Sequence, residues 1–281
     1  MSDLLSRSIV GFYRLWHGKC HLKGAGRLIN IAAPRLAGLR SFPLLLPNGE
    51  TARVDFNEIA AFSLQNYLLG DDHQESALVV AITQHLKEGD VFWDVGANTG
   101  VVSHHVRTLR PSCRQHLFEP NPKLRQWAQA MMSGYPDCVI HQLALSDQNG
   151  TSTLHIPEGL STLASISPKD RREGVQEVEI RVATADSLVF EQGYQPPKVI
   201  KVDTEGHEPA VFSGMTKVIA EHRPLIFFEH LELSDSQIQE FLPGGYSLAT
   251  VSQSGPGSLV TFDRDAGHNS VYFPGDWKTA I

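Results

Sequence analysis

Long hydrophobic runs are missing from this sequence of 281 residues. No segment approaches the roughly 18 consecutive apolar residues of a membrane-spanning helix. Near the N-terminus, Arg7 and Arg14 interrupt the apolar residues before the core of a signal peptide could form. Cysteine is scarce as well: Cys20, Cys113 and Cys138 are odd in number and far apart, which does not fit a disulfide framework. These absences predict a chain that resides in the reducing cytoplasm.

Basic residues are in the minority, with 24 Lys and Arg against 31 Asp and Glu, and they are unevenly placed. Residues 1–40 contain seven of them and one acid, Asp3, so this segment carries a charge of +6 and the remainder −13. The acidic remainder has no basic stripe, so nucleic acid is not expected as a substrate. The basic segment could touch a membrane surface peripherally, or it could be a solvated helix packed on the domain edge.

Segments with strand and helix patterns alternate along most of the chain. The predicted parallel strands are 91–95, 115–120, 139–145, 198–203 and 224–230. The predicted helices are 75–87, 101–109, 122–133, 208–222 and 234–242, and two last strands are expected at 246–253 and 269–274. This alternation is typical of an α/β fold with a mostly parallel, doubly wound sheet.

Two segments depart from the alternation. Residues 43–57 predict a β-hairpin that turns at Asn48-Gly49, a pair suited to positive φ angles. Residues 151–182 predict a second hairpin, inserted beside the third strand. We therefore divide the chain into an N-terminal extension, residues 1–74, and a main domain, residues 75–281.

A glycine-rich turn, DVGANTG at residues 94–100, joins the first predicted strand of the main domain to a helix. Glycine lets the backbone approach a ligand closely, and the free N–H groups at a helix start attract oxygen atoms. Such a turn can hold the polar part of a nucleotide-like ligand. Glycine turns after strands are common, so this motif gains its meaning from the residues around it.

Acidic residues follow nearly every predicted parallel strand, at the sheet edge where doubly wound folds bind their ligands. They are Asp94, Glu119, Asp147, Asp203 with Glu205, and Glu229. So many carboxylates would repel the pyrophosphate of a dinucleotide, whereas they would attract a cationic ligand. The loop also lacks the third glycine of G-x-G-x-x-G, and no basic residue awaits a phosphate there. S-adenosylmethionine therefore fits better than NAD, and Glu119 is spaced to bind its ribose.

Four motifs occur in order: DVGANTG, FEPNP, ALSD with Gly150 shortly after, and IKVDTEGHEPAVFSGM. With them the chain resembles the FkbM-type S-adenosylmethionine-dependent methyltransferases over about residues 50–250. The resemblance implies the class I methyltransferase fold, which is Rossmann-like, with a doubly wound seven-stranded sheet whose last strand is antiparallel. Many members of that family methylate hydroxyl groups.

The resemblance also implies a role for each motif residue. The methionine end of the cofactor would contact Asp94, Gly96, Ala97, Asn98, Thr99 and Gly100. The ribose would contact Glu119 in the turn with Pro120 and Asn121, and the adenine would lie by Ser146 and Asp147, with Leu143 and Ala144 as backbone contacts. Asp203 would lie near the transferred methyl group, and Glu75 is a further expected contact.

Methylation of a hydroxyl group needs a base at hydrogen-bond distance. The candidates are His207, Glu205, Asp203 and His230, and His207 is favoured because an imidazole titrates near neutral pH. An alternative role for His207 is to cap the helix that starts at Glu208. Asp203 and Glu205 could instead hold a divalent cation, but we expect no metal.

The sequence thus predicts a methyltransferase that acts on oxygen of a small molecule or glycan. We expect the inserted hairpin, with Ser161-Thr162, and the N-terminal extension to form the acceptor side. N-methylation of an amine or macromolecule stays an alternative, although no NPPY-type tetrapeptide follows the fourth strand. An NAD-dependent oxidoreductase or an inactive binding module is less favoured. The acceptor itself and the oligomeric state do not follow from the sequence.

Overall fold

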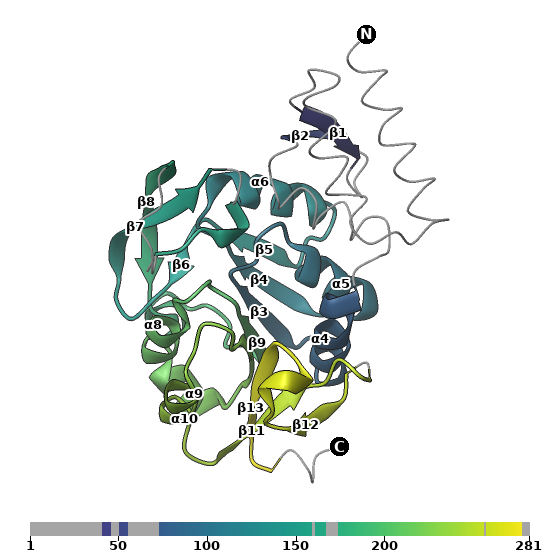
Figure 1. The fold of residues 1–281 in the computed structure, drawn as a ribbon, viewed down its shortest axis with the longest axis vertical. Coiled ribbons are helices and arrows are strands. Elements are labelled where there is room, and N and C mark those ends of the chain that lie inside the picture. Colours follow the sequence, from purple (N-terminus) through teal and green to yellow (C-terminus); the bar gives the residue numbers. More distant parts are fainter. Residues whose placement is uncertain are drawn as a thin grey trace.

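The structure is a computed structural model that describes residues 41–45, 51–55, 73–158, 161–166, 174–255 and 257–276. For residues 41–45, 51–55 and 73–76 it describes the backbone alone. The predicted basic helix and the turn at Asn48-Gly49 lie outside the described residues. A central sheet with helices on both of its faces forms the body of the protein (Figure 1).

Among the described residues the central sheet has eight strands, in the order β12-β11-β13-β10-β9-β3-β4-β5. Their bounds are β3 Val91–Val95, β4 Arg114–Phe118, β5 Cys138–His141, β9 Val199–Val202, β10 Leu225–Glu229, β11 Tyr246–Val251, β12 Leu259–Thr261 and β13 Asn269–Pro274. Strands β5, β4, β3, β9 and β10 pair in parallel, whereas β13 runs antiparallel to both β10 and β11. The predicted seven-stranded sheet with an antiparallel last strand is confirmed. Strand β12 was not predicted and extends its edge.

Helices cover both faces of this sheet. They are α4 His73–Gln84, α5 Val101–Leu109, α6 Pro122–Met131, α7 Ala185–Phe190, α8 Glu208–Ser213, α9 Thr216–His222 and α10 Asp235–Glu240, with short 3-10 turns η1 Ser161–Leu163 and η2 Arg264–Ala266. The predicted helix 208–222 is broken at Gly214, where a Cβ atom would lie 1.9 Å from the Ser146 carbonyl oxygen. None of the helices that the structure describes has the length and apolar character needed to cross a membrane.

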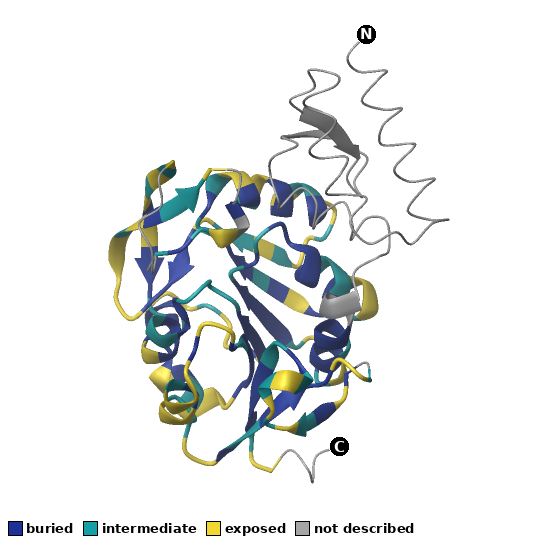
Figure 2. Ribbon diagram, in the orientation of Figure 1, coloured by how far each residue is buried: buried dark blue, intermediate teal, exposed yellow. Residues whose placement is uncertain are grey.

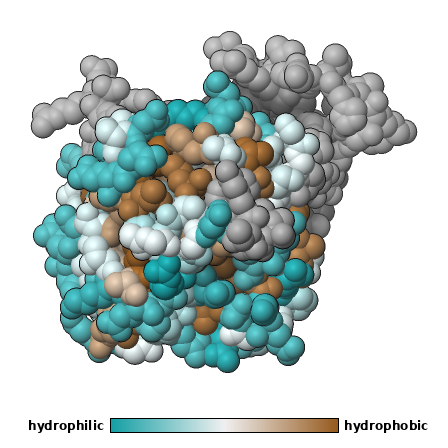
Figure 3. Space-filling view, turned by 90° about the horizontal axis from the view of Figure 1, so that it is seen from below, coloured by the Kyte–Doolittle hydropathy of each residue, from teal (hydrophilic) through white to brown (hydrophobic). Residues whose placement is uncertain are grey.

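Neighbouring residues of the central strands point into different cores. Phe92 and Phe227 pack with apolar residues of α4 and α5, such as Ile82. Trp93 and Phe228 pack on the other face, against α8 to α10. The strands are therefore buried on both sides (Figure 2), as expected of a parallel sheet between two helical layers. On the surface of the molecule seen from below, apolar residues gather in patches with hydrophilic residues around them (Figure 3).

A second, three-stranded sheet of order β6-β8-β7 lies beside the central one. It consists of β6 Ala144–Leu145, β7 Gly150–Pro157 and β8 Val175–Ala183. The antiparallel pair β7 and β8 confirms the inserted hairpin. The single strand predicted at 139–145 was wrong, since β5 ends at His141 and β6 pairs with β8 instead.

Near the N-terminus, β1 Ser41–Leu45 pairs antiparallel with β2 Thr51–Asp55, which confirms the strands of the first predicted hairpin. Helix α4 begins at His73, close to the proposed boundary between residues 74 and 75. The division into an extension and a main domain stays a prediction.

A buried lysine joins the two central strands β3 and β9. The Nζ atom of Lys201 lies 3.3 Å from Asp94 Oδ1 and 3.3 Å from Asp203 Oδ2, and it donates to the Gly96 carbonyl at 3.3 Å. Asp94 is fully buried, and its Oδ2 accepts a hydrogen bond of 2.6 Å from Ser103 on α5. A charge withdrawn from water in this way is tolerated only if its partners compensate it. Lys201 and Asp94 therefore depend on each other.

A cluster of aromatic rings is contributed by β4 and the edge strand β5. His116 Nδ1 and His141 Nε2 are 3.0 Å apart, and the His141 ring stacks on Phe118 at 4.9 Å between centroids. Burial and the neighbouring His116 lower the pKa of His141 to about 4. In the folded protein this imidazole is neutral at physiological pH.

Replacement of Lys201 by Met should strongly destabilise the fold, because it leaves Asp94 buried without its cation. The expected loss in free energy of unfolding is about 3 kcal/mol, measured by urea denaturation at neutral pH. Replacement of Asp94 by Asn in the same chain removes the orphaned charge and should restore part of the loss. A Lys201→Met protein as stable as the wild type would contradict the role of this ion pair.

The fold should also lose stability in mild acid through His141. Its pKa of about 4 in the folded state lies below the value of about 6.5 in an unfolded chain. The unfolded state binds more protons between these values, so stability declines as pH falls from about 6.5 towards 4. After allowance for solvent screening, this group should account for about 1 kcal/mol between pH 7 and 5.

A His141→Phe variant tests this origin, since it keeps a ring against Phe118 but takes up no proton. Urea unfolding at both pH values should show a smaller acid-induced loss of stability than in the wild type. The same substitution at the exposed His222 serves as the matched control and should leave the wild-type pH dependence. If His141→Phe retains the full dependence, the assignment to His141 fails.

Candidate active site

A cavity opens where strands β3, β4 and β9 end, between the central sheet and the second sheet. It comprises about 630 Å³ of empty space, including its open mouth. The described residues that line it are Val95, Gly96, Asn98, Phe118, Glu119, Pro120, Leu124, Ala144, Leu145, Leu154, Ser161, Ala164, Ile166, Asp203, Thr204, Glu205 and His207. Because the strand order reverses between β3 and β9, this is the place where a doubly wound sheet binds its ligand.

The glycine-rich turn after β3 packs directly onto the end of β9. Gly96 has a φ of 76°, and a Cβ atom there would lie 1.8 Å from the Asp203 carbonyl oxygen. Its N–H and that of Ala97 donate to the Phe118 carbonyl at 3.0 and 3.1 Å. Only glycine fits this position, so the turn can pack closely against the end of β9.

Glu119 holds two turns together at the cavity wall. Its Oε2 accepts a hydrogen bond of 2.7 Å from the Asn98 N–H, and its Oε1 accepts one of 2.8 Å from the Asn121 N–H. Burial raises the pKa of Glu119 to about 7, although these hydrogen bonds and Lys201 act against the rise. Each carboxylate oxygen has a further lone pair with which to accept a ligand hydroxyl group.

The inserted hairpin and the segment after it form an apolar wall of the same cavity. Leu154 comes from β7, whereas Ala164 and Ile166 follow η1. Ala164 and Ile166 also pack on the small hydrophobic core of the second sheet. Leu124 of α6 contributes from the other side. The insert therefore lines the cavity beside Glu119, and its assignment to the acceptor side stays a prediction.

Carboxyl groups crowd together where β9 and β10 end, and Asp203 and Glu205 among them line the cavity. Burial, reinforced by Asp203 and Glu208, raises the pKa of Glu205 to about 7. Burial and the charges of Asp203 and Glu205 raise the pKa of Glu229, at the end of β10, to about 8. Lys201 opposes both shifts. This end of the cavity is therefore poised to receive positive charge.

Glu208 serves the backbone rather than a ligand. Its Oε1 accepts hydrogen bonds of 2.7 and 2.9 Å from the N–H and the hydroxyl of Thr204, and the side chain is 1% exposed. Glu208 is also the first residue of α8, where a negative charge stabilises the helix N-terminus.

His207 lies on the cavity wall, at the residue before α8. It is the N-cap residue of α8, as the alternative role required, but its side chain makes no capping hydrogen bond to that helix. Instead, its Nε2 lies 3.0 Å from Ser146 Oγ, which in turn donates to Asp147 Oδ1 at 3.1 Å. Burial lowers the pKa of His207, and Asp147 acts against this. Ser146 and Asp147, expected beside the adenine, are thus directed towards His207.

Several other expected cofactor contacts have structural partners. Asp94 is engaged by Lys201, and Asn121 caps α6 by accepting from the Lys123 N–H at 3.0 Å while it borders a second cavity. Ala97 and Thr99 are buried within the turn. The backbone at Glu75 belongs to α4, but its side chain lies outside the described part of the chain.

The sequence analysis missed Lys201, which lies beneath the acids at the strand ends. All four residues of β9 are buried, including this lysine. A lysine inside an otherwise apolar strand is unusual unless it is paired, and that pattern was the available signal.

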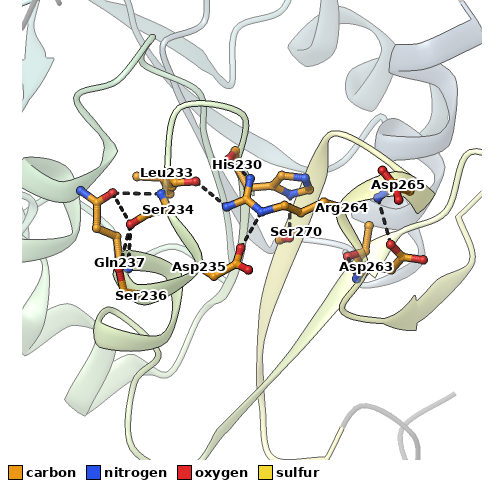
Figure 4. A network of polar contacts seen from close by, with 11 residues as sticks. His230, Leu233, Ser234, Asp235, Ser236, Gln237, Asp263, Arg264, Asp265 and Ser270 are labelled. Carbon is orange, nitrogen blue, oxygen red and sulfur yellow. Dashed lines mark hydrogen bonds and ion pairs between the residues drawn. The ribbon is translucent and has the colours of Figure 1, made fainter.

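His230 belongs to a structural network behind the cavity (Figure 4). It is fully buried, its Nδ1 lies 2.8 Å from Ser270 Oγ, and burial together with Arg264 lowers its pKa to about 4. Arg264 also donates to the carbonyl groups of His230 and Leu233 and pairs with Asp235 Oδ1 at 2.6 Å. This network fixes the loop after β10, and His230 is not among the described residues of the cavity wall. It is therefore no longer a candidate base.

Within the described ranges, no group of three or more His, Cys, Asp or Glu side chains is arranged to hold a metal ion. Asp203, one of the two acids considered for a cation, is paired with Lys201.

Comparisons with known proteins identify relatives. The model of the methyltransferase FkbM domain matches residues 94–262. The hexuronic acid methyltransferase AglP of Haloferax volcanii is 27% identical over 222 residues, which cover 79% of this chain and 88% of that protein.

Two solved structures are also similar to the chain. A methyltransferase FkbM from Methylobacillus flagellatus is 16% identical with a TM-score of 0.48, and the match covers 75% of this chain and 53% of that one. The chain thus spans about half the length of that structure. An S-adenosylmethionine-dependent O-methyltransferase from Thermotoga maritima is 10% identical with a TM-score of 0.41, covering 83% and 77% of the two chains.

The family match spans the glycine-rich turn, Glu119, and the acids and histidine after β9, and it covers more than half of the sequence. The chain belongs to the FkbM family of S-adenosylmethionine-dependent methyltransferases.

Proposed function

We propose that this enzyme transfers a methyl group from S-adenosylmethionine to an oxygen atom of a hexuronic acid or a related sugar in a glycan. The relationship to the hexuronic acid methyltransferase of Haloferax volcanii supports the acceptor class. The observation that carries the proposal is one cavity lined by the glycine-rich turn, Glu119, Glu205 and His207.

The residues of the cavity fit the parts of the cofactor. The turn at Gly96 and Asn98 lines the cavity, and we assign it to the methionine end. Glu119 is assigned to the ribose hydroxyl groups, because both of its oxygens keep lone pairs at the wall. The apolar side chains Leu124, Leu145 and Leu154 are assigned to the adenine.

The acids after β9 and β10 are assigned the role of stabilising positive charge during the reaction. S-adenosylmethionine supplies an activated methyl group on a positively charged sulfur. Asp203 and Glu205 line the wall where that charge would be stabilised, while Lys201 beneath them keeps the cluster from excess negative charge. The enzyme has then to orient the acceptor and to remove its proton.

His207 is assigned as the general base. It borders the cavity next to Glu205, and burial lowers its pKa, so the imidazole is neutral and able to accept a proton at physiological pH. Asp203 and Glu205 are the alternative catalytic groups, and the ion pair with Lys201 makes Asp203 a weaker candidate.

For the chain as a whole, we propose a cytoplasmic enzyme. The basic segment 1–40 is proposed as a contact for a membrane surface or an acidic partner, since seven of its residues are Lys or Arg. The extension 1–74 and the domain 75–281 are proposed as separate units.

A transfer assay tests the acceptor class. The full chain is incubated with S-adenosylmethionine carrying a labelled methyl group and with the methyl glycoside of glucuronic acid, and labelled product is measured. We expect methylation of the glucuronide and much less of the matching glucoside. Equal labelling of both sugars would overturn the hexuronic acid assignment, and labelling of an amino sugar at nitrogen alone would overturn O-methylation.

A Glu119→Ala variant should bind the cofactor more weakly. Loss of charge-assisted hydrogen bonds to the ribose should lower the affinity by about tenfold to a hundredfold, as measured by calorimetry with S-adenosylhomocysteine. Because Glu119 also holds two backbone N–H groups, thermal unfolding is measured in parallel. Glu179→Ala, on the exposed side of β8, is the control. Unchanged affinity in a folded Glu119→Ala protein would contradict the ribose assignment.

A further inference from the structure

We propose that Ser146 and Asp147 are positioning residues for His207, which hold its imidazole in the form that carries hydrogen on Nε2. The proposal rests on the proposed function, in which His207 takes the acceptor proton. Ser146 and Asp147, which were expected beside the adenine, would then orient His207 instead.

The directions of the two hydrogen bonds follow from the number of hydrogens available. Ser146 has one hydroxyl hydrogen, and a carboxylate such as Asp147 can only accept. Ser146 Oγ therefore donates to Asp147 Oδ1 at 3.1 Å, and its lone pair accepts from His207 Nε2–H at 3.0 Å. The opposite direction would bring the oxygens of Ser146 and Asp147 to the same 3.1 Å with no hydrogen between them.

The middle of this chain of hydrogen bonds is shielded from water. Ser146 is 4% exposed and His207 is 7% exposed, whereas Asp147 is exposed. Water competes for the Asp147 carboxylate but has little access to the hydroxyl that separates it from the ring. The charge of Asp147 thus reaches His207 through a fixed hydroxyl dipole.

The backbone around Ser146 keeps the hydroxyl group in place. Its N–H donates to the Ala183 carbonyl at 2.9 Å, which ties it to the end of β8. Its carbonyl oxygen is packed against Gly214, where a Cβ atom would approach to 1.9 Å. The missing side chain at Gly214, between α8 and α9, thus allows the backbone of Ser146 to pack against the helices.

The reaction balances with this arrangement. The O–H bond of the acceptor breaks as its oxygen forms a bond to the methyl carbon and the carbon–sulfur bond cleaves. The proton goes to Nδ1 of His207, and the resulting imidazolium keeps its Nε2–H bond to Ser146. The nearby carboxylate of Asp147 favours this cation. The other acids around it are Glu208, next in the chain, and Asp203 and Glu205 on the same wall.

A purely structural role would also explain the contact, since the Ser146–His207 bond links the loop after β6 to α8. The two roles differ in what they do to the imidazole. A positioning role fixes its tautomer and its pKa, whereas a structural link affects only stability.

Nuclear magnetic resonance of the full chain without cofactor separates these roles. The ring nitrogens of His207, assigned with a His207→Gln variant, should show hydrogen on Nε2 in the wild type. Ser146→Ala should give a mixture of tautomers, and Asp147→Asn should lower the pKa of His207. Asp265→Asn, an exposed aspartate of η2, is the matched control and should change neither. Hydrogen on Nδ1 in the wild type, or an unchanged pKa in Asp147→Asn, overturns the proposal.

Kinetics then tests the consequence with the methyl glucuronide as the acceptor. Ser146→Ala should lower kcat by about tenfold or more, with little change in KM for the cofactor. In Asp147→Asn the acidic limb of the kcat/KM profile should move to lower pH, because the imidazolium has lost its counter-charge. If kcat falls without movement of this limb, the role is structural and the proposal is wrong.

The two proposals fail in different ways. A wild-type enzyme that binds S-adenosylhomocysteine but methylates no sugar overturns the proposed acceptor, while the resonance measurement still reports on His207. Should Ser146→Ala not fold, the surface variant Asp147→Asn alone decides the outcome.

Discussion

The contact of Lys201 with Asp94 and Asp203 is the interaction on which the rest of the site depends. It joins the two strands between which the chain reverses its direction of winding, and Lys201 donates to the carbonyl of Gly96 in the glycine-rich turn. Because Asp94 is fully buried, the three groups have little freedom to rearrange. The position of the turn relative to Asp203 is thereby set before any ligand arrives.

The arrangement reconciles two opposing demands. A cationic donor favours carboxylates nearby, but carboxylates that crowd together repel one another and take up protons. Burial first and this repulsion second raise the pKa of Glu205 and of Glu229, and the lysine beneath them opposes the rise. The buried charge of Lys201 therefore lets the carboxyl groups of the pocket stay partly ionised. The site meets both demands by electrostatics rather than by its shape.

Local features were predictable from the sequence, whereas partners from distant segments were not. The strand 91–95 and the helix 101–109 were predicted with the bounds that the structure has, because apolar runs and glycine punctuation encode them locally. The split of 139–145 depends on pairing between β6 and β8, and the break at Gly214 depends on a carbonyl nearly 70 residues earlier in the chain. Likewise, the placement of Ser146 beside His207 arises only from the assembled fold.

The apolar wall that the insert contributes has a consequence for how such an enzyme can diversify. Leu154, Ala164 and Ile166 face the cavity from a segment that extends beyond the common sheet. A lineage that remodels this segment therefore also reshapes the cavity that Glu119 and the glycine-rich turn line.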